Sequence, residues 1–254
     1  MSQVLRSKEG VVELLVPAVL SRGEVTRFLS ELEAVAGNSP RILVLRGATS
    51  GFCRGMDLDE VALDGDSAPK PNWQLGTEDF VKILAVLRDS NAITLAVVEG
   101  PALGGGVGLA AACDFVVATN VATFALPELL MGLVPAMILP LLIERLGLQP
   151  AKRWAMTQAT WTAEAAKVSG LVDHLVQVER LDVELKRLVR SLLRSHPRGV
   201  MHLKQLLNEV RGMPLGAAIE RGQVLLAALL GQAEVRRELV AFRDYGLLPG
   251  EAEQ

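Results

Sequence analysis

Four short apolar runs constrain the fold of this chain more than any other feature of its sequence. They are Val11–Val16, Arg41–Arg46, Ile93–Val98 and Phe115–Ala118. Helical patterns or small-residue segments separate them, and the first of these, Glu24–Ala36, carries apolar residues at helical spacing. Short apolar strands that alternate with helices are typical of a parallel sheet with crossover helices. The sequence therefore predicts an α/β fold.

The pattern changes to long helices after Glu179. Val200–Val210 and Leu215–Phe242 carry more apolar surface than a small terminal subdomain can bury by itself. We therefore expect two parts, a core over residues 1–195 and a helical subdomain over residues 196–254 that associates with further copies of the chain.

Charge and cysteine content exclude several classes of protein. The 254 residues include 26 Lys and Arg against 29 Asp and Glu, a net charge of −3, so no basic field invites nucleic acid. Cys53 and Cys113 make no disulfide framework, and the N-terminal residues lack the apolar core of a secretion signal, which indicates the cytoplasm. The longest uncharged apolar stretch, Leu129–Ile143, is shorter than the ~18 residues that suggest a membrane span. We expect neither nucleic acid nor a membrane as a partner.

The first candidate for chemistry is Gly51–Asp57, with the sequence GFCRGMD, which follows the second predicted strand. Gly55 permits a backbone turn that exposes the next N–H, and Asp57 can cap a helix that begins at Leu58. The N–H of Met56 would then be free to bind an oxyanion. An ordinary strand-to-helix turn is the alternative that this segment leaves open.

The second candidate is Glu99–Gly108, which directly follows the third predicted strand. Its three consecutive glycines, Gly104, Gly105 and Gly106, let a ligand approach the N–H groups and the positive dipole end of the helix that they open. An anion or a developing oxyanion is the expected guest. The lysine of the GxxxxGK[ST] motif is absent and GxGxxG does not fit, so nucleotide binding is not favoured.

The third candidate is Glu128, a lone carboxylate in the apolar segment Phe124–Pro135. Burial without a partner would raise the pKa of this carboxyl group towards values that suit proton transfer. A buried glutamate that caps a helix is the alternative.

Taken together, FCRGMD, a GGG that opens a helix after a strand, CD and PELLMGLVP resemble the crotonase (enoyl-CoA hydratase/isomerase) superfamily over nearly the whole chain. The resemblance implies a β-β-α spiral core with a C-terminal helical trimerisation region, and hence a homotrimer or a dimer of trimers. It implies that the backbone N–H groups of Met56 and Gly105 hold a thioester oxygen as an enolate, with Gly104 and Gly106 at the substrate. Glu128 is then the catalytic carboxylate, with no metal and no resident cofactor.

Crotonase hydratases use two glutamates, whose positions here are Gly108 and Glu128. The segment where isomerases and dehalogenases carry an acid, Ala136–Leu142, has none. FCRGMDLDEV, the glycine at 108, LPELLMGLVPAMILPLLIERLG and GVMHLKQLL are more similar to the dehydratases of polyketide β-branching. This resemblance implies a hydro-lyase that converts 3-hydroxy-3-methylglutaryl-acyl carrier protein to 3-methylglutaconyl-acyl carrier protein, with the acyl group on phosphopantetheine.

Three alternatives stay open. One is an acyl-CoA hydratase or isomerase of general metabolism. Another is the decarboxylase partner of the β-branching pair, which generally has a histidine in the late helix, where Ala218–Leu230 has none. The third is a catalytically silent trimer that only binds acyl carriers.

The glutaryl chain would bring a second carboxylate into an apolar pocket, where it costs several kcal/mol unless a cation pairs with it. Arg54 adjoins the first donor, and its guanidinium fork suits a carboxylate. Lys204 is the alternative cation, and His202 beside it is a further substrate-binding candidate.

Overall fold

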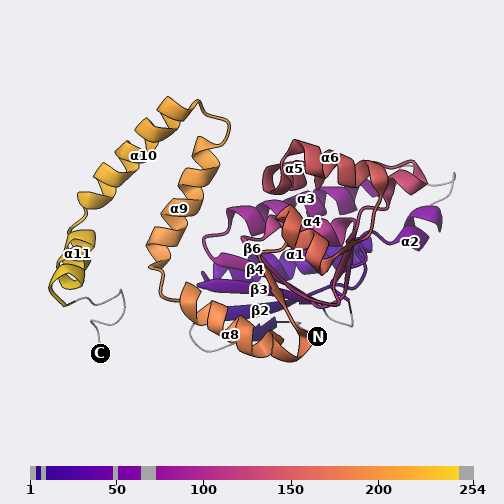
Figure 1. Ribbon diagram of the computed structural model, residues 1–254, viewed down its shortest axis with the longest axis horizontal. Coiled ribbons are helices and arrows are strands. Elements are labelled where there is room, and N and C mark those ends of the chain that lie inside the picture. Colours follow the sequence, from indigo (N-terminus) through magenta and orange to yellow (C-terminus); the bar gives the residue numbers. More distant parts are fainter. Residues whose placement is uncertain (1–3, 7–9, 48–50, 64–72, 246–254) are drawn as a thin grey trace. The chain divides into compact units, whose positions relative to one another are not determined.

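The chain divides into two compact units, Met1–Lys186 and Arg187–Gln254. The computed structural model describes residues 4–6, 10–47, 51–63 and 73–245. The boundary between the units falls inside helix α8 (Leu181–Leu192), ahead of the division expected between residues 195 and 196. The first unit contains both sheets, and the second consists of helices among its described residues (Figure 1).

The larger sheet has six strands in the order β1-β2-β3-β4-β6-β9 (Figure 1). They are β1 (Val4–Arg6), β2 (Val11–Val16), β3 (Ile42–Gly47), β4 (Ile93–Val98), β6 (Phe115–Thr119) and β9 (His174–Val176). β1 pairs antiparallel with β2, and the other neighbouring pairs run parallel. The four predicted strands lie side by side in this sheet, which confirms the α/β fold.

A second sheet of three strands, in the order β5-β7-β8, positions the site. Its strands are β5 (Pro101–Leu103), β7 (Thr123–Ala125) and β8 (Trp161–Thr162). β5 follows β4 and leads into helix α4 (Gly105–Ala112), and β7 follows β6 and leads into the 3-10 helix η1 (Glu128–Met131). We call this succession of two strands and a helix the ββα unit, and it is the β-β-α arrangement that the resemblance implies. Because β5 and β7 pair in parallel, α4 and η1 begin at the same sheet edge.

The first unit contains further helices besides α4, η1 and α8. They are α1 (Arg22–Gly37), α2 (Leu58–Leu63), α3 (Trp73–Asp89), α5 (Leu139–Leu146), α6 (Leu148–Thr157), α7 (Ala163–Ser169) and the 3-10 helix η2 (Val178–Arg180). α1 packs against α3, and α4 packs against α3 and α5. Every residue of α4 after Gly105 is buried, because its Gly, Ala, Val and Leu side chains let neighbouring backbone approach on all sides.

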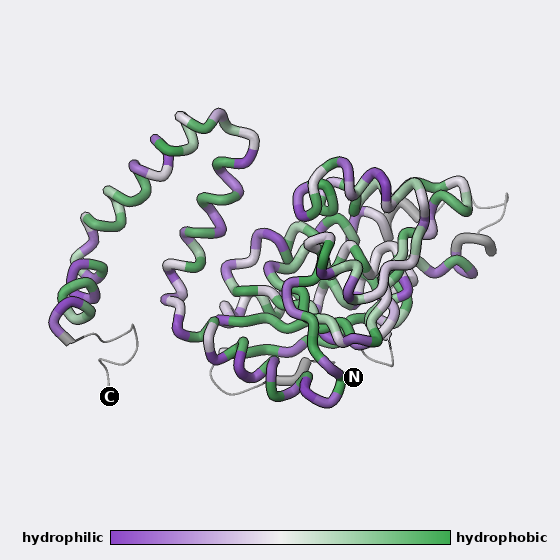
Figure 2. The backbone as a smooth tube through the Cα atoms, viewed as in Figure 1, coloured by the Kyte–Doolittle hydropathy of each residue, from purple (hydrophilic) through white to green (hydrophobic). Residues whose placement is uncertain are grey.

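The second unit contains α9 (Pro197–Val210), α10 (Leu215–Leu230) and α11 (Ala233–Tyr245). Apolar positions recur along all three helices (Figure 2). None of its described residues from 187 to 244 is buried, so this unit has no core of its own. No helix among the described residues combines the length and apolar character needed to cross a bilayer.

We expect the chain to associate with further copies of itself, because the apolar side chains of α9 to α11 need a covering surface, and the resemblance to the crotonase superfamily implies a homotrimer. Sedimentation equilibrium at micromolar concentration measures the mass. Ile219→Asp, at a 63% exposed position of α10, should shift the mass towards the monomer. Glu220→Asp, at the next exposed position, controls for the helix propensity of Asp and should leave the mass unchanged. A stable monomer of the parent chain would contradict the prediction.

Candidate active site

The first backbone donor is the N–H of Met56. The N–H of Leu20 donates to the carbonyl oxygen of Gly55 at 2.8 Å, and the N–H of Asp57 donates to the carbonyl oxygen of Leu20 at 3.3 Å. These two bonds form a parallel bridge in which the N–H of Met56 points away from Leu20. Among the described residues, no hydrogen bond takes up this N–H. Gly55 permits the turn, because its φ is +78°. A Cβ at this position would lie only 2.7 Å from the carbonyl oxygen of Leu103, which is too close for a side chain.

The second donor is the N–H of Gly105, the first residue of α4. Gly104 turns the chain with a φ of +49° and donates its own N–H to the carbonyl oxygen of Ala125 at 3.0 Å. No acceptor in the described part of the chain binds the N–H of Gly105. A Cβ on Gly55 would lie 3.1 Å from the nitrogen of Gly105, so the two donor segments are in direct contact. Both N–H groups are thus without an acceptor among the described residues, and the resemblance to the crotonase superfamily implies that they bind the same oxyanion.

Glu128 begins η1 and faces the backbone that leads into the second donor. Its Oε1 lies 3.0 Å from the place that a Cβ on Gly104 would occupy. Its Oε2 is buried and has no hydrogen-bond partner among the described residues. Burial raises the pKa of this carboxyl group, and a hydrogen bond from its own backbone N–H offsets part of the rise. An acid with a raised pKa can both take up and return a proton nearer to neutral pH.

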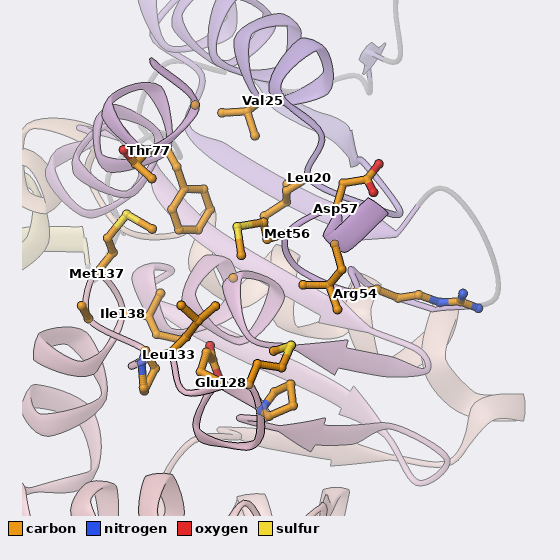
Figure 3. A pocket seen from close by; sticks show the side chains of 18 of the residues that line it. Leu20, Val25, Arg54, Met56, Asp57, Thr77, Glu128, Leu133, Met137 and Ile138 are labelled. Atoms are coloured by element: carbon orange, nitrogen blue, oxygen red, sulfur yellow. The ribbon is translucent and has the colours of Figure 1, made fainter. Parts of the chain in front are cut away.

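A cavity of about 320 Å³ is lined by Met56, Gly105 and Glu128 (Figure 3). The rest of its wall is mostly apolar and comes from the regions of α1, α2 and α3 and from η1 with the segments that flank it. The apolar lining residues include Leu20, Val25, Leu58, Phe80, Met131, Leu133, Val134, Met137 and Ile138. Such a wall excludes water and strengthens the interaction of an oxyanion with N–H donors.

Four other charged residues line the cavity, namely Arg22, Arg54, Asp57 and Glu60. Asp57 accepts hydrogen bonds from the N–H groups of Asp59 and Glu60 at 3.1 and 3.2 Å, so it caps α2 as predicted. Glu60 accepts the N–H of Arg22 at 2.8 Å and lies 3.9 Å from its Nε. These two carboxylates are therefore engaged in structural contacts, unlike Oε2 of Glu128.

The other predicted substrate-binding residues lie in different surroundings. Gly106 packs against the first donor segment, since a Cβ there would lie 2.2 Å from the carbonyl oxygen of Cys53. Arg54 is exposed, and its guanidinium extends away from Glu128 (Figure 3). His202 and Lys204 lie on α9 in the helical unit.

Three residues of the site gave no functional signal in the sequence. A Cβ on Gly105 would lie 2.8 Å from Cδ1 of Leu20 and 3.3 Å from Cζ of Phe80, so both side chains pack on the second donor. Arg22 follows Ser21, whose hydroxyl accepts the N–H of Glu24 at 3.4 Å as the N-cap of α1. That cap predicts a helix start, but it does not indicate a cavity.

This arrangement can remove a proton from a carbon next to a carbonyl group. Two N–H groups can stabilise the oxyanion, and Glu128 can accept the proton. Cys53 offers no competing nucleophile, because burial raises the pKa of its thiol to about 11.

Comparison with known proteins gives consistent matches. Residues 18–246 match the protein family described as enoyl-CoA hydratase/isomerase. The bacillaene synthase dehydratase PksH of Bacillus subtilis (strain 168) is 30% identical over 186 residues, which cover 73% of this chain and 70% of that protein. The 2,3-dehydroadipyl-CoA hydratase of Escherichia coli (strain K12) is 30% identical over 246 residues and 94% of both chains. Among solved structures, AtuE of Pseudomonas aeruginosa has a TM-score of 0.86 at 30% identity, covering 96% of this chain and 97% of that one.

We expect Glu128→Gln to raise the free energy of unfolding near neutral pH. Because the pKa of Glu128 is raised in the folded state, that state binds the proton more tightly than the unfolded chain does. The resulting stability is fully present below the unfolded pKa of about 4.3 and is lost as the pH rises through the higher folded pKa. The excess in the free energy of unfolding of Glu128→Gln over the parent should therefore grow as the pH rises from the unfolded to the folded pKa, and it should vanish near pH 4.

Urea unfolding at a series of pH values measures this advantage. Glu164→Gln, at an exposed position of α7, is the matched control and should show little pH dependence. Equal pH profiles for the two variants would mean that Glu128 is not desolvated in the folded protein.

Proposed function

The chain belongs to the enoyl-CoA hydratase/isomerase family, and we propose that it removes water from a 3-hydroxy-3-methylglutaryl group carried on an acyl carrier protein. The product is 3-methylglutaconyl-acyl carrier protein, in the β-branching of a polyketide. Hydratases and dehydratases are lyases, and this chain is an enzyme of that class. The acyl group arrives as a phosphopantetheine thioester, and the reaction uses neither a metal nor a resident cofactor.

The reaction begins when the thioester oxygen binds the N–H groups of Met56 and Gly105. Glu128 takes a proton from the α-carbon, and the electron pair moves onto the thioester oxygen as an enolate. Each backbone donor of this kind contributes about 2.7–4 kcal/mol to lowering the barrier. The enolate then forms the double bond between the α- and β-carbons while the bond from the β-carbon to the hydroxyl breaks.

The departing hydroxyl needs a proton, and Glu128 returns the one that it removed. The other two carboxylates that line the cavity, Asp57 and Glu60, accept hydrogen bonds from backbone N–H groups. Because Glu128 acts twice from a single side of the substrate, the α-proton and the β-hydroxyl leave from the same face.

The observation that carries this proposal is the buried Oε2 of Glu128, which has no hydrogen-bond partner among the described residues and belongs to a carboxylate beside the backbone of the second donor, in an apolar cavity. Position 108, where crotonase hydratases place a further glutamate, holds no acid. The similarity to PksH, which is described as a dehydratase, also supports the proposal.

A hydratase that acts on acyl-CoA is the second candidate, because the similarity to 2,3-dehydroadipyl-CoA hydratase spans 94% of the chain. The two candidates differ in the carrier of the acyl group. We expect kcat/KM for the carrier-protein thioester to exceed kcat/KM for the CoA thioester of the same acyl group. A preference for free CoA thioesters would favour the second candidate.

Glu128→Gln should abolish dehydration while leaving the fold intact, because loss of a general base costs about 10²–10⁴ in rate. Intact-mass spectrometry of the carrier-bound substrate detects the loss of one water. Glu164→Gln, which changes an exposed carboxylate on α7, should retain the parent rate. Comparable water loss with Glu128→Gln would remove Glu128 from the mechanism.

Arg54→Ala and Lys204→Ala test which cation meets the distal carboxylate. Arg54 lines the cavity, so Arg54→Ala should lower turnover of the 3-hydroxy-3-methylglutaryl carrier thioester far more than that of the 3-hydroxy-3-methylbutanoyl carrier thioester. Lys204→Ala tests the alternative cation with the same two substrates. Lys152→Ala, at an exposed position of α6, is the control. Equal impairment of both substrates by Arg54→Ala would mean that Arg54 does not meet the distal carboxylate, and no selective loss with either variant would leave the diacid preference without a cation.

A further inference from the structure

Ile138 fills the space that a side chain at position 108 would need. A Cβ built on Gly108 would lie 2.2 Å from Cγ2 and 3.0 Å from Cβ of Ile138. Ile138 is only 3% exposed, yet it lines the cavity together with Glu128 (Figure 3). The absence of a side chain at Gly108 is therefore what allows this branched side chain to lie directly on α4.

The resulting surface has a defined place relative to the second donor. Gly105 and Gly108 are three residues apart on α4, so they share one helix face and lie about 4.5 Å apart along its axis. A substrate whose thioester oxygen binds the N–H of Gly105 has its β-carbon two bonds from the carbonyl carbon. The β-carbon and its substituents therefore lie within reach of Ile138.

The apolar surface that Ile138 and Phe80 form above Gly108, called the wall below, determines which substrate groups can lie against it. Cζ of Phe80 is 3.8 Å from the same point above Gly108, so the surface consists of aliphatic and aromatic carbon. A hydroxyl or a carboxylate placed there would lose its hydrogen bonds to water without replacement. A methyl group would lose nothing and would bury apolar surface.

We propose that Ile138, seated on Gly108, is the specificity-determining residue that receives the methyl group on the β-carbon of the substrate. This inference rests on the proposed function, in which the β-carbon carries a hydroxyl, a methyl and a carboxymethyl group. Only the methyl group can lie on the wall without desolvation cost. Its placement there fixes the rotation about the bond between the α- and β-carbons, so that the hydroxyl lies on the side of the cavity that holds Glu128.

Binding of two unreactive probes tests the wall without any turnover. The probes are 3-methylpentanoyl and pentanoyl thioesters of 4′-phosphopantetheine. Both carry an ethyl group on the β-carbon in place of the carboxymethyl group, neither carries a hydroxyl, and only the branched probe also carries the β-methyl group. Isothermal titration should show that the parent binds the branched probe about 10-fold or more tightly than the straight one. Ile138→Ala should remove this preference. Ile138→Val, which keeps Cγ2 on Gly108 and loses only the terminal methyl, should retain it within about 3-fold.

Gly108→Ala tests the same contact from the helix side. The new Cβ would push Ile138 into the cavity, so it should weaken the branched probe more than the straight one and lower the melting temperature. In the Ile138→Ala background the 2.2 Å contact is gone, so Gly108→Ala should lower the melting temperature less than it does in the parent. Equal losses in both backgrounds would contradict the packing on which the proposal rests.

Failure of the inference and failure of the proposed function give different results. Equal affinity of the parent for the two probes, or a preference that survives Ile138→Ala, would overturn the role of Ile138 even if the glutaryl substrate loses water. A methyl preference that disappears in Ile138→Ala would support the role of Ile138. If the parent shows this methyl preference but does not dehydrate the glutaryl substrate, the proposed reaction is wrong and the role of Ile138 in binding a methyl group still holds.

Discussion

The site depends on a backbone contact between two segments that are distant in the sequence. The N–H of Leu103 donates to the carbonyl oxygen of Cys53 at 2.9 Å, and this bond sets the segment that carries Met56 against the strand that leads to Gly105. Main-chain atoms make the contact, so it requires close approach and not particular side chains. A Cβ on Gly106 would stand 2.2 Å from that same carbonyl oxygen. Glycine at this position is therefore a condition for having two donors at one point.

A second constraint is the free-energy cost of burying Oε2 of Glu128, which finds no hydrogen-bond partner in the described part of the chain. The parallel pairing of β5 with β7 holds η1 beside the start of α4, so the rigid sheet maintains a carboxylate that would be more stable in water. The same desolvation that lowers stability raises the proton affinity of the acid. Stability and reactivity thus oppose each other at this residue.

The sequence predicts the parts of the structure that leave local signals. Alternating apolar runs predict the parallel strands, and the resemblance carried by the glycines and by the motif around Glu128 implies which backbone groups and which acid lie in one site. Leu20, Phe80 and Ile138 could not be predicted as cavity residues, because an aliphatic or aromatic residue at helical spacing looks the same in a core and in a wall.

The ββα unit occurs twice, although the sequence contains no repeat that reveals it. In its first copy the residues after the second strand are glycines, and the helix start presents an N–H. In its second copy they include a glutamate, and the helix start presents a carboxylate. One scaffold element thus supplies either an electrophilic or a basic group, according to the few residues that follow its second strand. Evolution can therefore exchange the acid–base chemistry of such an enzyme while its oxyanion-binding backbone stays the same.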